Sequence, residues 1–340
     1  MEAIVHNGTG GPEILQFRDV PTPEPGPGQI RVRVLAAGLN RADILQRRGG
    51  YPAPPGWPAD IPGLEYAGEV ERLGSNVTRW KPGNRVMGLV GGGAHAEFVV
   101  VHEDEVLAAP AELSIQDASA IPEAFLTAYD ALFTRGQLQS GERVLIHAAG
   151  SGVGTAAVQL ARQAGAMVIG TSRTPSKLIP LKGLGLDLGI DTSTRSFRDQ
   201  IDAPVNLILD VLGGPAYADN LAVLATRGRL IILGFLQGPV ASEVNLAPIL
   251  RRRITVIGTV MRTRELSERA ALVAEFRVKA LPNFGAHLPV EEPLRSAGHP
   301  EQRPHTLRPV VHAVFPMKEI AAAHREMEAN RGVGKIVLSW

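Results

Sequence analysis

The sequence predicts an α/β protein that combines a doubly wound parallel sheet with a second domain of barrel-like β structure. From about Ser114 onward, apolar runs alternate with helical segments, as is typical of βα units in a sheet covered on both faces. Before that point, short strand-like stretches are separated by Gly and Pro, as in a compact β domain. One strand also leads directly into a glycine-rich turn and a helix, over residues 143–165. At 340 residues, the chain is long enough for about two domains.

The β-rich part is clearest in the segment QIRVRVLAAGL. There Ile30, Val32 and Val34 alternate with two arginines, which predicts a strand with one buried face. The segments GEVERLG, GNRVMGLV and HAEFVVVHEDEV repeat this character at close spacing. We therefore expect several short strands joined by tight turns in the first part of the chain.

Six buried runs, with helical segments between most of them, predict the parallel sheet. The helical stretch from Ser114 to Phe133 begins with a residue that can cap a helix, and Asp117 follows three positions later. Another helix is expected over 153–165. Six strands in this arrangement fit a doubly wound dinucleotide-binding fold. The expected strands are 144–149, 167–172, 188–191, 205–211, 229–234 and 254–260.

The last part of the chain is too short and too poor in strands to form a third domain. Helical spacing over 264–281 is followed by a polar, Pro-rich stretch, 291–305, to which we assign no function. A strand at 310–315, a helix at 317–330 and a last strand at 334–340 then follow. We expect this tail to return to the first domain and complete it.

Composition excludes several kinds of protein. With 35 basic and 34 acidic side chains, the net charge of +1 argues against nucleic acid as the main partner. The absence of cysteine excludes disulfides, thiol catalysis and any metal site with Cys ligands. No segment has the roughly 18 continuous apolar residues of a membrane span, and the N-terminus lacks the pattern of a secretion signal. We therefore expect a cytoplasmic enzyme with no membrane partner.

The segment RVLIHAAGSGVGTAAVQLARQAG carries the chemistry. Gly150, Gly152 and Gly154 would let the backbone turn tightly and approach a pyrophosphate. The free N–H groups and the positive end of the following helix would favour the phosphate charge. In the G-x-G-x-x-G window, Ala149 and Ser151 replace the first two glycines. The preceding strand, the following helix and a second strand about 20 residues later nevertheless favour a dinucleotide site over an ordinary turn.

The end of the second strand suggests which dinucleotide binds. Sites specific for NAD usually place an acidic residue there, but GTSRTPSKL contains no carboxylate between Gly170 and Leu178. Ser172, Arg173 and Lys177 instead offer a hydroxyl and two cations to a 2′-phosphate. The alternative is a solvated loop with ordinary basic residues. We favour NADPH as the cofactor.

Other catalytic arrangements fit poorly. The nucleophile pattern G-x-S-x-G fails at Ser151, because residue 149 is Ala. No tyrosine is followed four residues later by lysine, which excludes a Tyr/Lys proton relay of that spacing. The histidines form no H-x-x-x-H or H-E-x-x-H pair, and His147 in a buried strand fits a core residue better than a ligand.

Together, these motifs resemble the medium-chain dehydrogenase/reductase superfamily, specifically its zinc-independent quinone oxidoreductase branch. Within that branch, the sequence looks most like the p53-inducible quinone oxidoreductase group. The resemblance implies a GroES-like catalytic domain over 1–125, completed by 265–340, and a Rossmann NADP(H)-binding domain over 126–264. The segments that carry the resemblance are AAGLNRADILQRRGGYPAPPG, IPGLEYAGEVERLG, LSIQDASAIPEAFLTAYDALF, IHAAGSGVGTAAVQLARQAGA, DVLGG and MEANRGVGKIVL.

The resemblance also implies that no metal is bound. Zinc-dependent relatives have Cys at the position of Asn40, and His at the position of Leu64, before the retained Glu65. Neither an amide nor an aliphatic side chain supplies the thiolate or imidazole that a tetrahedral zinc site uses. What remains is hydride transfer to electron-poor carbonyl compounds, with the protein supplying orientation and a few hydrogen-bond donors.

The family places two candidate catalytic residues beside the substrate cleft. Asn40 could orient the nicotinamide carboxamide or donate to a carbonyl. Tyr51 is the candidate for a substrate hydrogen bond or a proton donor, and the alternative is a loop aromatic that covers a Pro-rich turn. Asp43 and Glu65 are secondary candidates.

The resemblance extends to the cofactor contacts. Ser151 to Gly154 would wrap the pyrophosphate, and Ser172 and Lys177 would hold the 2′-phosphate. The expected cofactor contacts are Asn40, Thr127, Ser151, Gly152, Val153, Gly154, Ser172, Arg173, Lys177, Gly234, Phe235, Met261, Arg262 and Asn330. Relatives pair the strand at 254–260 across a two-fold axis, so we expect a homodimer.

Three functions fit this reading. The first is an NADPH-dependent quinone oxidoreductase that works without zinc. The second is an NADPH-dependent alkenal or enone double-bond reductase, which would share the cofactor and cleft and differ in substrate shape. The third, from another class, is a non-catalytic NADPH-binding protein, because a fold can be kept while its chemistry is lost.

Overall fold

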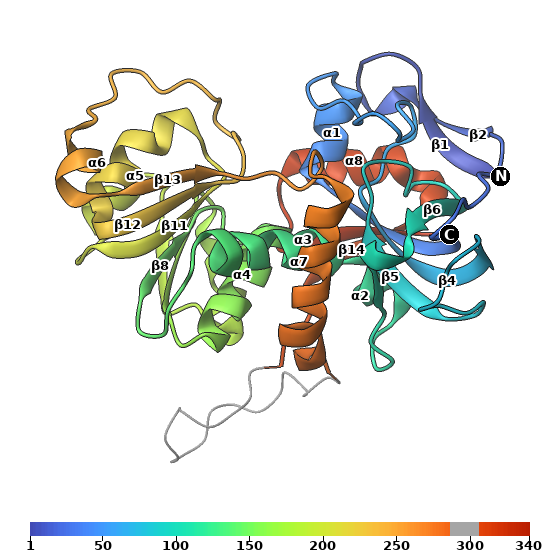
Figure 1. Ribbon diagram of the computed structural model, residues 1–340. Helices are drawn as coiled ribbons and strands as arrows, with labels where there is room; N and C mark the ends of the chain where they lie inside the picture. Colours follow the sequence, from blue (N-terminus) through green and yellow to red (C-terminus); the bar gives the residue numbers. More distant parts are fainter. Residues whose placement is uncertain (286–305) are drawn as a thin grey trace.

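The structure is a computed structural model that describes residues 1–285 and 306–340 and forms two lobes side by side (Figure 1). The polar stretch 291–305 lies outside the described residues. Within the described parts of the chain, no helix is both long and apolar enough to cross a lipid bilayer.

One lobe is built on a six-stranded parallel sheet with the order β10-β9-β8-β11-β12-β13. The strand order reverses between β8 and β11, which is the switch point of a doubly wound fold. This confirms the α/β fold class that the six buried runs predict. The strands are β8 (Arg143–Ile146), β9 (Met167–Ser172), β10 (Leu188–Asp191), β11 (Val205–Asp210), β12 (Leu224–Ile232) and β13 (Thr255–Gly258).

Helices connect these strands, and two further helices lie at the junction of the lobes. Helix α4 crosses from β8 to β9, while α5 and α6 flank β12. Helix α3 packs against both α4 and α7, and α7 stands between the lobes (Figure 1). The helices are α3 (Pro122–Tyr129), α4 (Gly152–Gln163), α5 (Tyr217–Val223), α6 (Ala247–Arg252) and α7 (Leu266–Lys279).

The helical stretch expected over 114–133 is divided into shorter helices in the structure. Helix α2 (Ile115–Ser119) ends before Pro122, which begins α3, and a π-helical turn covers Asp130–Arg135. Proline has no N–H to donate, so it is tolerated at the start of a helix and breaks the ladder elsewhere. The predicted cap is present, since Ser114 Oγ accepts from the Asp117 amide at 3.0 Å.

The other lobe contains a seven-stranded sheet with the order β14-β15-β3-β4-β5-β7, and β6 also pairs with β3. The late strand β15 runs antiparallel to β3, with Leu338 opposite Ala37, so segments far apart in sequence share this sheet. The strands are β3 (Gln29–Leu39), β4 (Glu65–Leu73), β5 (Arg85–Leu89), β6 (Phe98–His102), β7 (Val106–Ala108), β14 (Val311–Pro316) and β15 (Lys335–Ser339). Strands β1 (Glu2–His6) and β2 (Leu15–Asp19) form a separate antiparallel pair, and α1 (Arg41–Arg47) and α8 (Ile320–Ala329) complete the lobe.

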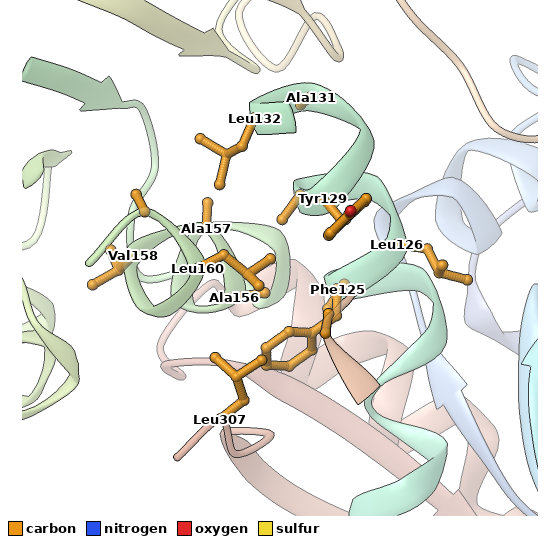
Figure 2. Packing of buried hydrophobic residues seen from close by; sticks show 14 of the residues in the cluster. Phe125, Leu126, Tyr129, Ala131, Leu132, Ala156, Ala157, Val158, Leu160 and Leu307 are labelled. Carbon is orange, nitrogen blue, oxygen red and sulfur yellow. The ribbon is translucent and has the colours of Figure 1, made fainter. Parts of the chain in front are cut away.

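The largest hydrophobic core crosses the junction between the lobes. Figure 2 shows Phe125 of α3 packed near Ala156 and Leu160 of α4, with Leu307 beside them. The same cluster reaches Met87 of β5 in the other lobe. Burying each large side chain contributes about 1.5–3 kcal/mol, so this shared core holds the facing edges of the lobes together.

Candidate functional site

The glycine-rich turn lies at the carboxyl end of β8, beside the switch point of the parallel sheet. Ser151 caps α4, and its Oγ accepts a hydrogen bond from the Gly154 amide at 3.0 Å. The carbonyl of Ala148 accepts from the Ser151 amide at 2.9 Å, and Ala148 itself has a positive φ of 49°. Open sheets bind ligands in this crevice, where the helix N-terminus favours negative charge.

Two glycines of this turn lie where a side chain would meet neighbouring atoms. A Cβ on Gly154 would lie 2.6 Å from the carbonyl oxygens of Ala148 and Ala149. A Cβ on Gly152 would lie 2.5 Å from Cδ of Lys335. None of the three glycines has a positive φ, so the tight turn is made at Ala148.

A late segment of the chain is bonded to this turn. Gly334 donates its amide to the Gly150 carbonyl at 2.9 Å, and it forms a parallel bridge with Ser151. Asn330 ends α8 in the left-handed conformation, with φ 52°. The Lys177 ammonium donates to the Asn330 carbonyl at 2.6 Å, which ties the same segment to the chain after β9.

The predicted 2′-phosphate residues lie together at the end of β9. Ser172 and Lys177 are buried, whereas Arg173 is exposed. Burial lowers the pKa of Lys177, and the cations of Arg41 and Arg173 lower it further. The segment GTSRTPSKL contains no carboxylate, but a neighbouring strand brings one to its start. Asp191 of β10 pairs in register with Ser172. The Ser193 amide donates a hydrogen bond to Asp191 Oδ1 at 2.8 Å.

The predicted catalytic residue Asn40 lies at the N-terminus of α1, in the other lobe. Its Nδ2 group donates to Glu65 Oε1 at 2.9 Å and to the Gly38 carbonyl at 3.3 Å. Its Oδ1 accepts from Lys335 Nζ at 2.5 Å. The Asn40 backbone amide donates to Asp43 Oδ2 at 2.7 Å, which completes a capping box. The side-chain donors of Asn40 are therefore engaged, and its Oδ1 already accepts from Lys335.

Lys335 connects the glycine-rich turn to a cluster of buried polar side chains, Asn40, Glu65 and Lys335 itself, which we call the pocket. Its aliphatic stem lies against Gly152, and its ammonium contacts Asn40, the Leu39 carbonyl at 2.9 Å and Glu65 Oε1 at 2.5 Å. Glu65 is fully buried, and the lysine is 5% exposed. A buried carboxylate is costly without a partner of opposite charge, so this ion pair stabilises the buried Glu65 side chain.

The residues that the family resemblance places at zinc-ligand positions do not fit a zinc ion. An amide and an aliphatic side chain, Asn40 and Leu64, stand at those positions, and the Lys335 ammonium lies between Asn40 and Glu65. An ammonium in this place repels a second cation and occupies the available oxygens. No group of three or more His, Cys, Asp or Glu suited to a metal occurs within residues 1–285 and 306–340.

Tyr51 and Arg262 lie against each other across the junction of the lobes. The Arg262 guanidinium stacks 4.8 Å from the Tyr51 ring centroid and donates to the Tyr51 carbonyl at 2.8 Å. It also donates to the Gly91 carbonyl at 2.7 Å and to Gln46 Oε1 at 2.6 Å. Arg262 is 6% exposed, and its guanidinium is engaged by Tyr51, Gly91 and Gln46. Burial raises the pKa of Tyr51 to about 12, so its hydroxyl stays protonated at neutral pH.

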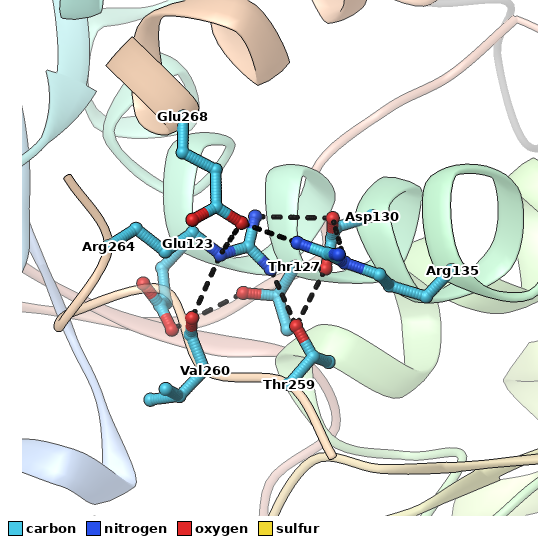
Figure 3. A network of polar contacts seen from close by, with 8 residues as sticks. All are labelled: Glu123, Thr127, Asp130, Arg135, Thr259, Val260, Arg264 and Glu268. Carbon is cyan, nitrogen blue, oxygen red and sulfur yellow. Dashed lines mark hydrogen bonds and ion pairs between the residues drawn. The ribbon is translucent and has the colours of Figure 1, made fainter. Parts of the chain in front are cut away.

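The loop that carries Arg262 is anchored to the end of α3 by a buried polar network (Figure 3). Arg264 and Asp130 form a two-pronged ion pair, with contacts of 2.5 and 3.2 Å. Thr259 donates to Asp130 Oδ2 at 2.9 Å, and Arg264 also bonds to the Val260 carbonyl at 2.9 Å. Residues 259–264 are therefore fixed at both ends of the loop.

The remaining predicted cofactor contacts lie on α3, on α4 and in the segments after β12 and β13. Thr127 on α3 donates to Glu123 Oε1 at 3.4 Å, and Met261 packs against the shared core. Gly234 and Phe235 follow β12, and Phe235 is 55% exposed. Val153 lies in the first turn of α4 and is half-buried.

Two polar residues of the pocket escaped the sequence analysis. Lys335 stands in the segment GKIVL, and Glu123 follows Pro122 at the start of α3. The only signal for either was a charged side chain inside an otherwise apolar pattern. His147 is the buried core residue that the sequence predicts, bonded to Thr171 at 3.0 Å and to Asn220 at 2.7 Å.

Comparison with known proteins identifies the family. Residues 26–111 match the family model "Alcohol dehydrogenase GroES-like domain", and residues 152–275 match "Zinc-binding dehydrogenase". A quinone oxidoreductase of Pseudomonas aeruginosa is 34% identical over 342 residues, with 97% of this chain and 96% of the relative covered. The chain belongs to the medium-chain dehydrogenase/reductase family. Its place is in the quinone oxidoreductase and VAT-1 branch.

Two further relatives support the same family assignment. The human synaptic vesicle membrane protein VAT-1 homolog is 31% identical, with 99% of this chain and 86% of the relative covered. The quinone oxidoreductase of Thermus thermophilus, solved also in complex with NADPH, superposes with a TM-score of 0.81 at 35% identity over the full length of both chains. The GroES-like and Rossmann parts of the fold class are thereby confirmed.

Proposed function

We propose that this medium-chain reductase is an NADPH-dependent quinone oxidoreductase that transfers hydride without zinc. The observation that carries the proposal is the Lys335 bridge between the glycine-rich turn and the Asn40–Glu65 pair. It joins a nucleotide turn to a pocket whose zinc-ligand positions hold an amide and a leucine. Quinones suit such a pocket, because their conjugated carbonyls delocalise the added negative charge without a Lewis acid.

The proposed cofactor site runs along the carboxyl edge of the parallel sheet. NADPH supplies the hydride when bound. The turn from Ser151 to Gly154 would hold the pyrophosphate, and Ser172, Arg173 and Lys177 would hold the 2′-phosphate. The carboxylate of Asp191, beside Ser172, works against a preference for NADPH, because it would repel the 2′-phosphate. The other proposed contacts are Asn40, Thr127, Gly234, Phe235, Met261 and Asn330. For Arg262, which the resemblance also implies as a contact, we propose a positioning role instead.

Each of the two proposed catalytic residues has a definite role. Asn40 is held in place by Glu65 and Lys335, and it would orient the nicotinamide carboxamide. Tyr51 keeps its hydroxyl proton at neutral pH and would donate a hydrogen bond to the acceptor carbonyl. Arg262 would fix the Tyr51 loop.

The organisation of the chain follows the same proposal. Residues 1–125 and 265–340 would form the catalytic domain, and 126–264 the cofactor domain. The pairing of β15 with β3 supports this division. We also propose membership of the p53-inducible group within the branch, and a homodimer joined at β13, which is an end strand of its sheet.

The direct test measures oxidation of NADPH and NADH by the purified protein, with EDTA present. The acceptors are 1,4-benzoquinone, a larger naphthoquinone and an α,β-unsaturated aldehyde. We expect fast, NADPH-selective turnover with the quinones that the chelator leaves unchanged. Turnover with the aldehyde alone would replace the proposal with double-bond reduction, and NADPH binding without turnover would replace it with a non-catalytic binding role.

A further inference from the structure

Glu123 is an ionisable residue of the pocket that the proposed function does not yet use. It lies in the first turn of α3 and is half-buried. Its backbone amide donates to Glu65 Oε2 at 2.8 Å, and its Oε1 accepts from the Thr127 hydroxyl at 3.4 Å. Within the described parts of the chain, its carboxylate forms no ion pair with a lysine or arginine.

The surroundings of Glu123 favour the protonated carboxyl. Burial raises its pKa to about 7, with a further contribution from the negative charge of Glu65. The Lys335 cation acts in the opposite direction, but its ammonium is bonded to Glu65 itself. The ionisable groups that face Glu123 are Asp43 on α1, Tyr51 in the loop after α1, Glu65 on β4, Arg262 after β13 and Lys335 on β15.

Reduction of a quinone needs a proton as well as a hydride. The hydride brings two electrons to the acceptor, and the resulting oxyanion must gain a proton to leave as a neutral hydroquinone. A group that gives this proton must lie at the pocket and be able to take another from water afterwards. The Glu123 carboxylate accepts from Thr127, a proposed cofactor contact, and its backbone amide donates to Glu65.

We propose that the Glu123 carboxyl gives the proton to the acceptor oxygen. The O–H bond of the carboxyl breaks, an O–H bond forms on the reduced acceptor, and the carboxylate regains its proton from solvent. Tyr51 then serves as a hydrogen-bond donor that positions the acceptor. This inference rests on the proposed quinone reduction and names the acid for it.

The two candidate acids predict different pH profiles. An acid with a pKa of about 7 loses its proton across the neutral range, so kcat falls above that value. Tyr51, with a pKa of about 12, would produce no fall between pH 5.5 and 9. The shape of the profile therefore separates Glu123 from Tyr51.

The test compares wild type, Glu123→Gln and Glu123→Asp in NADPH oxidation with a naphthoquinone from pH 5.5 to 9. We expect the wild-type kcat to fall about tenfold per pH unit well above neutrality. Glu123→Gln should lower kcat by roughly 10²–10⁴-fold at pH 6 and abolish the fall, with an unchanged Kd for NADPH. Glu123→Asp should restore part of the rate together with a pH-dependent fall.

The matched control is Glu275→Gln, because Glu275 is also half-buried and also accepts from a hydroxyl of α3, that of Tyr129 at 3.2 Å. It should leave the profile unchanged. A second readout needs no cofactor: the unfolding free energy of wild type should decrease from pH 5 to pH 8 relative to that of Glu123→Gln. A Glu123→Gln enzyme with the wild-type rate and profile would overturn the inference alone. A wild type that reduces no quinone at any pH would overturn the proposed function together with it.

Discussion

At the scale of the residue, the position of Arg262 explains how one side chain shapes the pocket. The sequence resemblance implies a cofactor contact, whereas in the structure the guanidinium binds Gln46 and the carbonyls of Tyr51 and Gly91. A planar guanidinium can donate to several acceptors and stack on an aromatic ring at the same time, which an ammonium cannot do. Arg262 is therefore better described as a positioning residue for Tyr51.

The substitution Arg262→Lys tests this description. It should raise the KM for the quinone roughly tenfold, equivalent to about 1.4 kcal/mol, because the Tyr51 loop loses its support. The Kd for NADPH, measured by fluorescence titration, should change little. A tenfold weaker Kd with an unchanged KM would instead support direct contact with the cofactor. The exposed Arg253→Lys serves as control.

Lys335 gives a second prediction at this scale. The substitution Lys335→Met leaves the Glu65 carboxylate buried without a cation, which should lower the unfolding free energy by about 3–5 kcal/mol. The double variant Lys335→Met/Glu65→Gln removes the unpaired charge and should recover much of that loss. Urea denaturation measures both. Equal stability of the single and double variants would show that the ion pair is not what stabilises the pocket.

At the scale of the element, Gly154 is the position of the glycine-rich turn where backbone atoms leave least room for a side chain. Gly154→Ala would place a Cβ 2.6 Å from two backbone carbonyl oxygens, which cannot rotate away as a side chain can. We expect the variant to lose NADPH binding by at least tenfold and to unfold at a lower temperature. Gly183→Ala, whose Cβ would meet nothing within 4 Å, should do neither. Calorimetric titration and thermal unfolding provide the two readouts.

The elements also show how far the sequence could predict the structure. Strand β3 covers the same residues as its alternating pattern, and β9 and β10 match their buried runs, because local periodicity determines them. The break before Pro122 was missed, since helical spacing continued across it. The Lys335–Asn40 contact joins residues 295 positions apart, and no local pattern reports such a distance.

At the scale of the whole molecule, buried neutral histidines couple stability to acid. Burial lowers the pKa of His147 to about 4 and that of His324 to about 3, and it also lowers the pKa of His95. Below the ordinary value of about 6.5, the unfolded chain binds protons that the folded chain refuses. The contribution of these histidines to stability is therefore complete above about pH 6.5 and is lost as the pH falls toward 4.

This coupling can be measured by urea denaturation between pH 7 and 4.5. His147 alone should account for up to about 3 kcal/mol, at 1.36 kcal/mol per unit of pKa shift. His147→Gln should therefore flatten the pH dependence, even if it is less stable than wild type at pH 7. The exposed His312→Gln should keep the wild-type slope. An unchanged slope in His147→Gln would mean that His147 does not control the acid transition.

The bridge made by Lys335 has a consequence for synthesis of the chain. Asn40 and Glu65 leave the ribosome long before Lys335, and β3 has no β15 beside it until then. The emerging N-terminal lobe must therefore keep an acidic pocket hydrated and a sheet edge unpaired while the whole Rossmann sheet is translated. Both the nucleotide turn and the pocket are completed in one late event, so incomplete chains would be unable to bind cofactor in a working geometry. They would also expose an edge that a chaperone or a protease can recognise.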